Sequence, residues 1–400
     1  MPLDDDAAVG TTTTPRRLFD AETNAAVADR LFKHIDEGTT DLAPSQIRLD
    51  PAVYSDPALA ALEQERIFDR APVIVAHSSE VANPHDFVTV DLPGNQVLVV
   101  RQPDGRIRAF VNVCRHRGSC LVDEPAGNRR VLACPYHGWC YNSDGGLRSI
   151  TYPETFGDLD RSGFGLVRLP AEERHGLIWV VQRPGVALDV AGWLGPGMDD
   201  VLAAYALEDY HCDRKASFDE VMNWKVATDA FVDGYHLKFA HPQSVGPHFY
   251  TNVQLFSDFG RHARWIVPRK RIDRIRFEAP GTAAVDLYVT VGHFLMPNTT
   301  LLRQPDHFQV LTFVPHPTDP TRSRMDVRLL VTEPVTSEED RQMWDRNFEI
   351  LLSAVVAEDL PLNRRLQAAV MGRGVAPLIV GRNEPGNQLF HREWARALAE

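Results

Sequence analysis

The architecture of this chain is decided by two short stretches, Cys114-Arg115-His116-Arg117-Gly118 and Cys134-Pro135-Tyr136-His137-Gly138-Trp139. Together they give the pattern Cys-x-His, seventeen residues, Cys-x-x-His. Two thiolates and two imidazoles on paired short loops can bind one metal centre. The pattern therefore predicts a metal site with four ligands: Cys114, His116, Cys134 and His137.

The ligand set favours a Rieske [2Fe–2S] cluster, in which two cysteines bind one iron and two histidines bind the other. Imidazole donates electrons less well than thiolate, so such a cluster has a reduction potential of about −150 to +300 mV. A [2Fe–2S] cluster bound by four cysteines has a reduction potential of about −400 mV. A structural zinc ion is the alternative, since the same ligands can complete a tetrahedral site. The spacing of the first pair argues against zinc, because Cys114 and His116 are only two positions apart. Gly118 and Gly138 also permit close backbone approach to a cluster.

The composition excludes several classes of protein. A length of 400 residues leaves room for two or three domains, and 44% hydrophobic residues is ordinary for a globular chain. The net charge of −12, with no basic run, argues against nucleic acid or an anionic membrane as partner. No apolar stretch approaches the ~18 residues of a membrane-spanning helix, and the start lacks a secretory signal. We expect a cytoplasmic protein in which Cys120 and Cys140 are free thiols.

The spacing of apolar residues predicts an α+β protein with three segments. Helical spacing appears over 18–37 and from 55 to about 68, and short strands separated by turn signals follow up to 184. These patterns predict a helical arm (1–50) packed on the catalytic domain, and an all-β cluster domain (51–184).

The remaining segment, 185–400, is predicted to combine helices with an antiparallel sheet. Its expected strands cover 285–296, 299–303, 308–314 and 325–331. A helix is predicted over 221–241, because Pro242 cannot continue it. A longer helix is predicted over 337–370, because Ser337 and the acidic residues after it favour a helix start.

A second set of metal ligands is predicted in this segment. Asp229, Asp233 and His236 are spaced i, i+4 and i+7, so on a helix they share one face, with His241 near its end. Two histidines and one carboxylate can bind Fe(II) and leave positions open for O₂ and substrate. The best remote carboxylate is Asp359, on a helix whose other face is apolar. A solvated helix face with two incidental histidines is the alternative, but a one-electron cluster upstream needs an acceptor.

The chain resembles the large (α) subunits of Rieske non-haem iron ring-hydroxylating oxygenases from about Tyr54 to its end. The resemblance implies a Rieske all-β domain joined to a helix-grip (START-like) catalytic domain with an antiparallel sheet. The matching motifs are the four cluster ligands, Asn223-Trp224-Lys225, Asp233-Gly234-Tyr235-His236, His241, Leu295-Met296-Pro297-Asn298 and Glu358-Asp359.

The resemblance also implies residue roles and partners. His236, His241 and Asp359 would bind the iron, and Asp233 would link His137 of one subunit to His236 of the next in a homotrimer (α3) or an α3β3 assembly. Replacing Asp233 with Asn is expected to leave the metals bound and to stop turnover. No Gly-x-Gly-x-x-Gly fingerprint is present, so electrons from NAD(P)H would arrive through a reductase, with or without a ferredoxin.

The implied reaction is mono- or dioxygenation of an aromatic or alicyclic substrate, carboxylated or not. The motif Asp-Gly-Tyr-His resembles the corresponding motif of benzoate- and anthranilate-type members. N- or O-dealkylation of a quaternary amine is an alternative, although members with that activity tend to carry Glu at the position of Asp233. An electron-carrier protein and a non-catalytic START-like ligand-binding protein with a zinc site are further alternatives. Asp229 is predicted to bind substrate or to share a proton with Asp233, and the other candidate pocket residues are Phe231, Val232, Leu237, Phe294, Leu352 and Val356.

Overall fold

The structure is a computed structural model, which describes residues 19–278 and 284–400. Residues 1–18 of the predicted arm lie outside the described residues. The chain divides into two compact units. The smaller unit consists of 62–193 and 206–211, and the described residues of the larger unit are 19–61, 194–205, 212–278 and 284–400. Residues 51–61 therefore lie in the larger unit, and 185–193 lie in the smaller.

The smaller unit is built from three antiparallel sheets, as short strands with turn signals predict. Their orders are β10-β5-β4-β3-β6, β11-β12-β2 and β7-β8-β9. The strands are β2 (Val73–His77), β3 (Asp86–Asp91), β4 (Gln96–Arg101), β5 (Ile107–Val111), β6 (Ala126–Asn128), β7 (Val131–Ala133), β8 (Cys140–Asn142), β9 (Leu147–Ser149), β10 (Arg168–Leu169), β11 (Ala171–Arg174) and β12 (Leu177–Val180).

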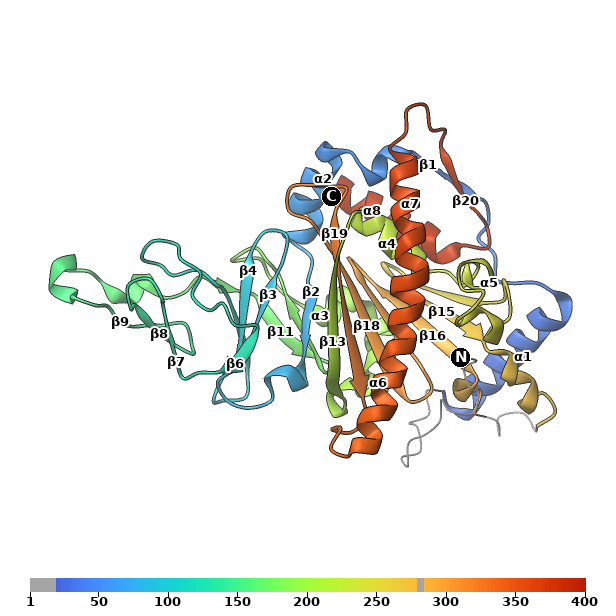
Figure 1. Cartoon of the computed structure of the whole chain (residues 1–400), viewed down its shortest axis with the longest axis horizontal. Helices are drawn as coiled ribbons and strands as arrows, with labels where there is room; N and C mark the ends of the chain where they lie inside the picture. Colours follow the sequence, from blue (N-terminus) through green and yellow to red (C-terminus); the bar gives the residue numbers. More distant parts are fainter. Residues whose placement is uncertain (1–18, 279–283) are drawn as a thin grey trace. The chain divides into compact units, whose positions relative to one another are not determined.

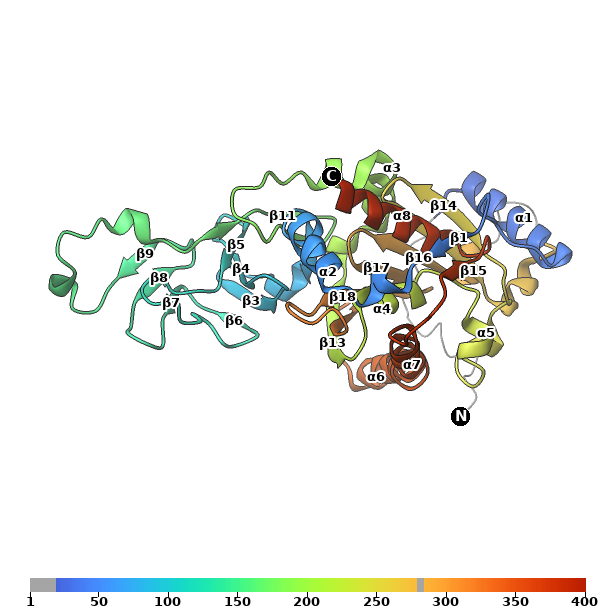
Figure 2. The ribbon, with the colours of Figure 1, turned by 90° about the horizontal axis from the view of Figure 1, so that it is seen from above.

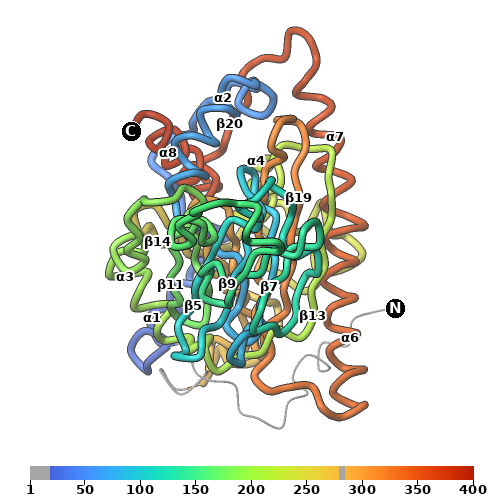
Figure 3. The backbone as a smooth tube through the Cα atoms, turned by 90° about the vertical axis from the view of Figure 1, so that its left-hand side faces the viewer, coloured from blue at the N-terminus to red at the C-terminus, as the bar shows by residue number. Residues whose placement is uncertain are grey.

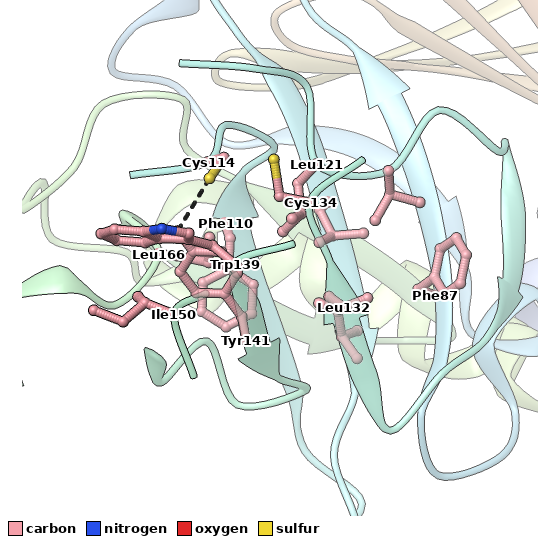
Figure 4. Close-up of a cluster of buried hydrophobic side chains, with 13 residues drawn as sticks. Phe87, Phe110, Cys114, Leu121, Leu132, Cys134, Trp139, Tyr141, Ile150 and Leu166 are labelled. Carbon is pink, nitrogen blue, oxygen red and sulfur yellow. Dashed lines mark hydrogen bonds between the residues drawn. The ribbon is translucent and has the colours of Figure 1, made fainter. Parts of the chain in front are cut away.

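One hydrophobic cluster joins the strands of this unit to the two ligand loops. Phe87 and Phe110 come from β3 and β5, and they belong to one cluster with Leu132 and Tyr141 from β7 and β8 (Figure 4). Leu98 of β4 is a further member of this cluster. Cys114 and Cys134, the two predicted ligand cysteines, belong to the same cluster. The loops therefore rest on a packed core, which fixes the cysteine positions.

The larger unit contains a seven-stranded sheet in the order β13-β19-β18-β17-β16-β15-β14 (Figure 1). Neighbouring strands from β14 to β19 pair antiparallel. The strands are β13 (His211–Glu220), β14 (Leu255–Phe259), β15 (His262–Pro268), β16 (Val289–Leu295), β17 (Thr299–Arg303), β18 (His307–Pro315) and β19 (Ser323–Val331). The predicted first strand begins four residues late, because Val285–Leu287 forms a 3-10 turn. The α+β class and the antiparallel sheet are confirmed.

Helices pack against the sheet, and eight of the nine residues of β18 are buried. The helices are α1 (Ala21–Glu37), α4 (Trp224–Ala230), α5 (Leu237–Ala240), α6 (Glu338–Leu352), α7 (Leu360–Val370) and α8 (Pro385–Ala399). Helix α4 contacts α7 and strands β18 and β19, whereas α8 packs against β14 and β15 (Figure 2). A short pair, β1 (Ile47–Leu49) and β20 (Leu378–Val380), lies apart from the large sheet. Helix α2 (Pro57–Glu63) and helix α3 (Val190–Tyr205), which is interrupted at Gly195, cross the boundaries between the units.

The long helix predicted over 337–370 is confirmed as a nearly straight run from Glu338 to Val370 (Figure 3). Helix α6 passes through a π-helical segment, η10 (Ser353–Asp359), into α7. The hydroxyl of Ser337 accepts a hydrogen bond from the Asp340 N–H (3.0 Å), which caps the helix start. Asp359 is the last residue of η10, so the packing of this helical run sets its position in the larger unit.

The single helix predicted over 221–241 is wrong. Helix α4 ends at Ala230, and α5 begins only at Leu237. Between them the Asp233 carboxylate accepts hydrogen bonds from the N–H groups of Tyr235 (2.6 Å) and His236 (3.0 Å). An aspartate that binds nearby backbone N–H groups competes with helix formation. Asp229 and Asp233 therefore do not lie on one continuous helix face.

Candidate functional site

The two cysteine–histidine loops share one hydrogen-bond pattern. In each loop the cysteine N–H donates to the carbonyl of the fifth residue on, at 2.8 Å in both cases. The N–H groups of Gly118 and Gly138 donate back to the carbonyls of Cys114 (3.0 Å) and Cys134 (3.1 Å). Both glycines have positive φ (77° and 68°), a conformation that favours glycine. The repeated turn presents both thiols from equivalent positions.

The two thiols lie in a buried environment. Cys114 is 2% exposed and Cys134 is 3% exposed, and Figure 4 shows both at the edge of the hydrophobic cluster. The hydroxyl of Tyr141 lies 3.3 Å from the Cys114 sulfur and accepts a hydrogen bond from the Arg115 N–H. Burial raises the pKa of Cys114 despite the opposing hydrogen bond from Tyr141. Thiolates here require a positive partner, which an iron centre provides.

The two histidines of the loops lie side by side. Their ring centroids are 4.6 Å apart, and Trp139 stacks on His116 at 4.9 Å with an interplanar angle of 5°. Desolvation, then the neighbouring His137, lowers the pKa of His116, which favours the neutral imidazole that binds metals. The Nδ1 atom of His116 is buried and has no hydrogen-bond partner among the described residues. A buried ring nitrogen without a partner, together with two buried thiols, fits the predicted [2Fe–2S] ligand set.

The second constellation brings together His236, His241 and Asp359. One ligand atom from each lies within 4.8 Å of the others. The Asp359 Oδ1 atom is 3.0 Å from His241 Nε2 and 3.9 Å from His236 Nε2. The histidines flank α5, and Asp359 ends η10, so the site forms only when these elements pack together. Two imidazoles and a carboxylate at this separation fit one mononuclear iron ion.

A carboxylate lies behind each histidine of this constellation. Asp233 Oδ1 is 3.0 Å from His236 Nδ1, and Glu358 Oε2 is 2.8 Å from His241 Nδ1. The Ser244 hydroxyl donates to the same Glu358 oxygen. The contact of Glu358 with His241 was not predicted from the sequence. The one signal in the sequence was that Glu358 directly precedes Asp359, a predicted metal ligand.

The electrostatics of the constellation favour a cation. Burial lowers the pKa of His236, but the carboxylates of Asp233 and Asp359 outweigh it and raise this pKa to about 8. Burial also opposes protonation of His241, and Asp359 and Glu358 raise the His241 pKa above its ordinary value. Metal-free protein would attract protons to these imidazoles, so a divalent metal ion has to compete with them.

The six predicted apolar pocket residues lie in different surroundings. Phe231 is buried and its ring centroid is 5.4 Å from that of Phe313 on β18. Phe294 is fully buried against Phe390 of α8, with centroids 5.2 Å apart. The Val232 backbone packs against α8. The other three, which are partly exposed, are Leu237, Leu352 and Val356. A role of these side chains in substrate binding stays a prediction.

Asp229 is held by side chains from distant parts of the chain. Its carboxylate accepts hydrogen bonds from the Tyr54 hydroxyl (2.7 Å) and the Asn387 amide (3.2 Å), and it lies 3.0 Å from His391 Nε2. Burial, then the charge of Asp229, raises the pKa of Tyr54. These contacts tie α4 to α8 and to the segment before α2. A role of Asp229 toward substrate or toward Asp233 stays a prediction.

Family models match both units. The "Rieske [2Fe-2S] domain" matches residues 71–161, and the "Ring hydroxylating alpha subunit (catalytic domain)" matches residues 207–400. The chain belongs to the Rieske ring-hydroxylating oxygenase large-subunit family. Each set of candidate ligands lies within the corresponding matched range. The Rieske domain implies a [2Fe–2S] cluster, and the catalytic domain implies a non-haem iron ion.

Two curated relatives of this Rieske oxygenase chain differ in substrate. The anthranilate 1,2-dioxygenase large subunit of Acinetobacter baylyi is 32% identical over 214 residues, which cover 51% of this chain and 45% of the relative. The chain thus spans about half the length of that relative. The carnitine monooxygenase oxygenase subunit of Escherichia coli K12 is 27% identical over 326 residues, covering 80% of this chain and 83% of the relative.

A solved structure shares the fold. The quaternary ammonium Rieske monooxygenase CntA, in complex with an inhibitor, superposes with a TM-score of 0.76 at 21% identity, covering 89% of this chain and 96% of that one. Among the described residues, no helix is long and apolar enough to cross a membrane. Cys120 and Cys140 form no disulfide in the structure.

Proposed function

We propose that this chain is the terminal oxygenase component of a Rieske non-haem iron oxygenase (EC 1.14), which inserts oxygen from O₂ into an organic substrate. The observation that carries the proposal is the presence of two different ligand sets on one chain. Buried Cys114 and Cys134 lie with His116 and His137 in one unit. The His236, His241 and Asp359 triad lies in the other. When bound, a one-electron cluster and a ferrous ion together supply the electrons that activate O₂.

The chain's own residues hold and orient these ligands. Asp233 accepts the Nδ1 proton of His236, which leaves Nε2 of that ring directed toward Asp359. The hydrogen bonds from the backbone N–H groups of Tyr235 and His236 to Asp233 keep this turn in shape. Buried surroundings exclude water from Asp359, which is 5% exposed, and from His241, which is 2% exposed. A water-poor site strengthens each of these electrostatic contacts.

We propose an aromatic or alicyclic substrate, carboxylated or not, for mono- or dioxygenation. The similarity to an anthranilate 1,2-dioxygenase subunit supports an aromatic acid as the substrate. The motif Asp233-Gly234-Tyr235-His236 supports the same choice. A quaternary amine is the second candidate, because the carnitine monooxygenase subunit aligns over most of both chains. Aspartate at position 233 supports the first candidate.

We further propose the partners and the assembly. A reductase, with or without a ferredoxin, would supply electrons from NAD(P)H. A homotrimer, or an α3β3 assembly, would bring His137 of one subunit close to Asp233 and His236 of the next. Cys120 and Cys140, which form no disulfide, fit a cytoplasmic location, where thiols stay reduced.

The test begins with protein purified without air. We expect visible absorption from the cluster, acid-labile sulfide and iron in excess of two per chain. O₂ uptake is then measured with a surrogate reductase and three probes: benzoate, anthranilate and carnitine. As a control, His236→Ala should keep the visible spectrum and lose the third iron and the activity. Protein with no inorganic sulfide, or with a single metal per chain, would overturn the proposal.

A further inference from the structure

The imidazole of His241 lies between the carboxylates of two consecutive residues. Its Nε2 atom is 3.0 Å from Asp359 Oδ1, and its Nδ1 atom is 2.8 Å from Glu358 Oε2. The ring is 3% exposed, so both contacts lie away from solvent. A neutral imidazole carries one proton, and the nitrogen that keeps it donates to its partner. The contact on Nδ1 therefore decides whether Nε2 is free to bind a metal.

The helix geometry explains how two adjacent residues reach one ring. Consecutive side chains on an α-helix point about 100° apart, since there are about 3.6 residues in each turn. Glu358 and Asp359 are the last two residues of the π-helical segment η10, where the backbone is wider than in α6 or α7. Isolated π-helical turns inside α-helices occur often at functional sites. Here the segment presents one carboxylate to each side of His241.

A third residue holds Glu358 in place. The Ser244 hydroxyl donates to the same oxygen of Glu358 that faces His241. The Glu358 side chain is 18% exposed, so its position depends on these two contacts rather than on burial alone. Ser244 and His241 belong to the same short segment after α5, three residues apart. The segment and the long helix are thus linked through one carboxylate oxygen.

We propose that Glu358, held by Ser244, is the positioning residue for the metal ligand His241. It accepts the Nδ1 proton, so the ring stays in the tautomer and orientation in which Nε2 points at the metal ligands. The inference rests on the proposed function in one respect, namely that His236, His241 and Asp359 bind a divalent metal ion. Asp233 makes the equivalent contact with His236, so each metal-binding imidazole has its own carboxylate.

The expected effect is measured as metal affinity. Loss of a hydrogen-bonding partner behind a metal-binding histidine typically costs about 10–100-fold in affinity. Glu358→Ala removes both the acceptor and the charge, so it should show a loss within this range. Glu358→Gln keeps an acceptor oxygen at the same reach, so its loss should be smaller. Ser244→Ala should weaken binding in the wild-type background and have no further effect beside Glu358→Ala, because the two residues act through one contact.

The experiment uses the full chain with its cluster intact and its mononuclear site emptied by a chelator. Co²⁺ is the probe. Its affinity is measured by competition with a chelator, and the visible ligand-field bands of bound Co²⁺ report on how the ligands are arranged. Glu349→Gln is the matched control, because Glu349 is an exposed residue of α6 and its replacement removes the same charge. We expect this control to match wild type in both readouts.

Three results would be decisive. Weaker Co²⁺ binding and altered bands in Glu358→Ala, with smaller changes in Glu358→Gln, would support the proposal. The proposal for Glu358 would be overturned if both Glu358→Ala and Glu358→Gln matched Glu349→Gln in Co²⁺ affinity and in the visible bands. That result would leave the proposed metal site intact. Wild-type protein that binds Co²⁺ no better than His236→Ala would instead overturn the proposed metal site itself. Because Glu358→Gln is nearly isosteric, the comparison holds even if the alanine variant folds poorly.

Discussion

Asp233 is expected to have two separable tasks, and its substitution tests both. One oxygen of its carboxylate accepts hydrogen bonds from the N–H of Tyr235 (2.6 Å) and the N–H of His236 (3.0 Å). The same oxygen is 3.0 Å from His236 Nδ1. The first two contacts shape the turn between α4 and α5. The third holds the ring of His236, the proposed metal ligand.

The magnitudes follow from these contacts. Removing a side-chain cap of backbone N–H groups costs about 1 kcal/mol of stability, so Asp233→Ala should lower the free energy of unfolding by about that amount. Losing the partner of His236 should weaken metal binding by about 10–100-fold, or about 1.4–2.8 kcal/mol. Asp233→Asn keeps an acceptor oxygen for the turn. Its stability should therefore stay close to that of wild type.

Two measurements separate the tasks. Urea unfolding of metal-free protein reports on the turn, and competition for Co²⁺ reports on the ring. Turnover with a surrogate reductase is the third readout, in which Asp233→Asn should bind both metals and fail to form product. The reasoning is refuted if Asp233→Ala binds Co²⁺ as tightly as wild type does. Normal product formation by Asp233→Asn would refute its role between the two centres.

Three further predictions concern stability. Burial lowers the pKa of His293 to about 3, below its ordinary value of about 6.5, and the Tyr205 hydroxyl lies 2.9 Å from its Nε2. Between pH ~6.5 and 3 the unfolded state binds a proton on His293 that the folded state does not, so stability falls as the pH falls through this range. Between pH 7 and 5 the free energy of unfolding of wild type should therefore fall by about 2 kcal/mol more than that of His293→Gln, measured by urea unfolding. Equal losses in the two proteins would contradict this. Ser337→Ala should lower stability by about 1 kcal/mol through the lost helix cap, whereas Ser337→Asp should not. Asp286→Ala leaves the buried Arg303 without the carboxylate at 3.2 Å, and should lower the unfolding free energy by about 3–5 kcal/mol; a loss below 1 kcal/mol in calorimetry or urea unfolding would count against a buried pair.

Local signals in the sequence were sufficient for several features. The predicted cluster ligands Cys114, His116, Cys134 and His137 lie on two short turns, and the shape of each turn depends on residues that are neighbours in the sequence. The strands from β17 to β19 and the helix from Glu338 to Val370 followed from runs of apolar residues and from the Ser337 cap. In each case the residues that determine the structure are neighbours along the chain.

Other features required the tertiary structure. Glu358 and His241 are 117 residues apart, so no spacing rule relates them. Tyr54 and Asp229 are 175 residues apart, and their contact depends on how the turn Pro51–Tyr54 lies against α4. The break after Ala230 was missed, although its cause is local. Helical spacing of Asp229, Asp233 and His236 suggested one face, yet the Asp233 carboxylate binds the following N–H groups instead.

Features set by neighbouring residues could be predicted from the sequence, whereas features set by long-range packing could not. The sequence by itself determined which residue types are available as ligands and which segments form strands or helices, because those properties depend on neighbouring residues. Only the tertiary structure decided which carboxylate stands behind which histidine. That choice depends on the packing of α5 against the π-helical turn η10, and long-range packing leaves no periodic trace in the chain.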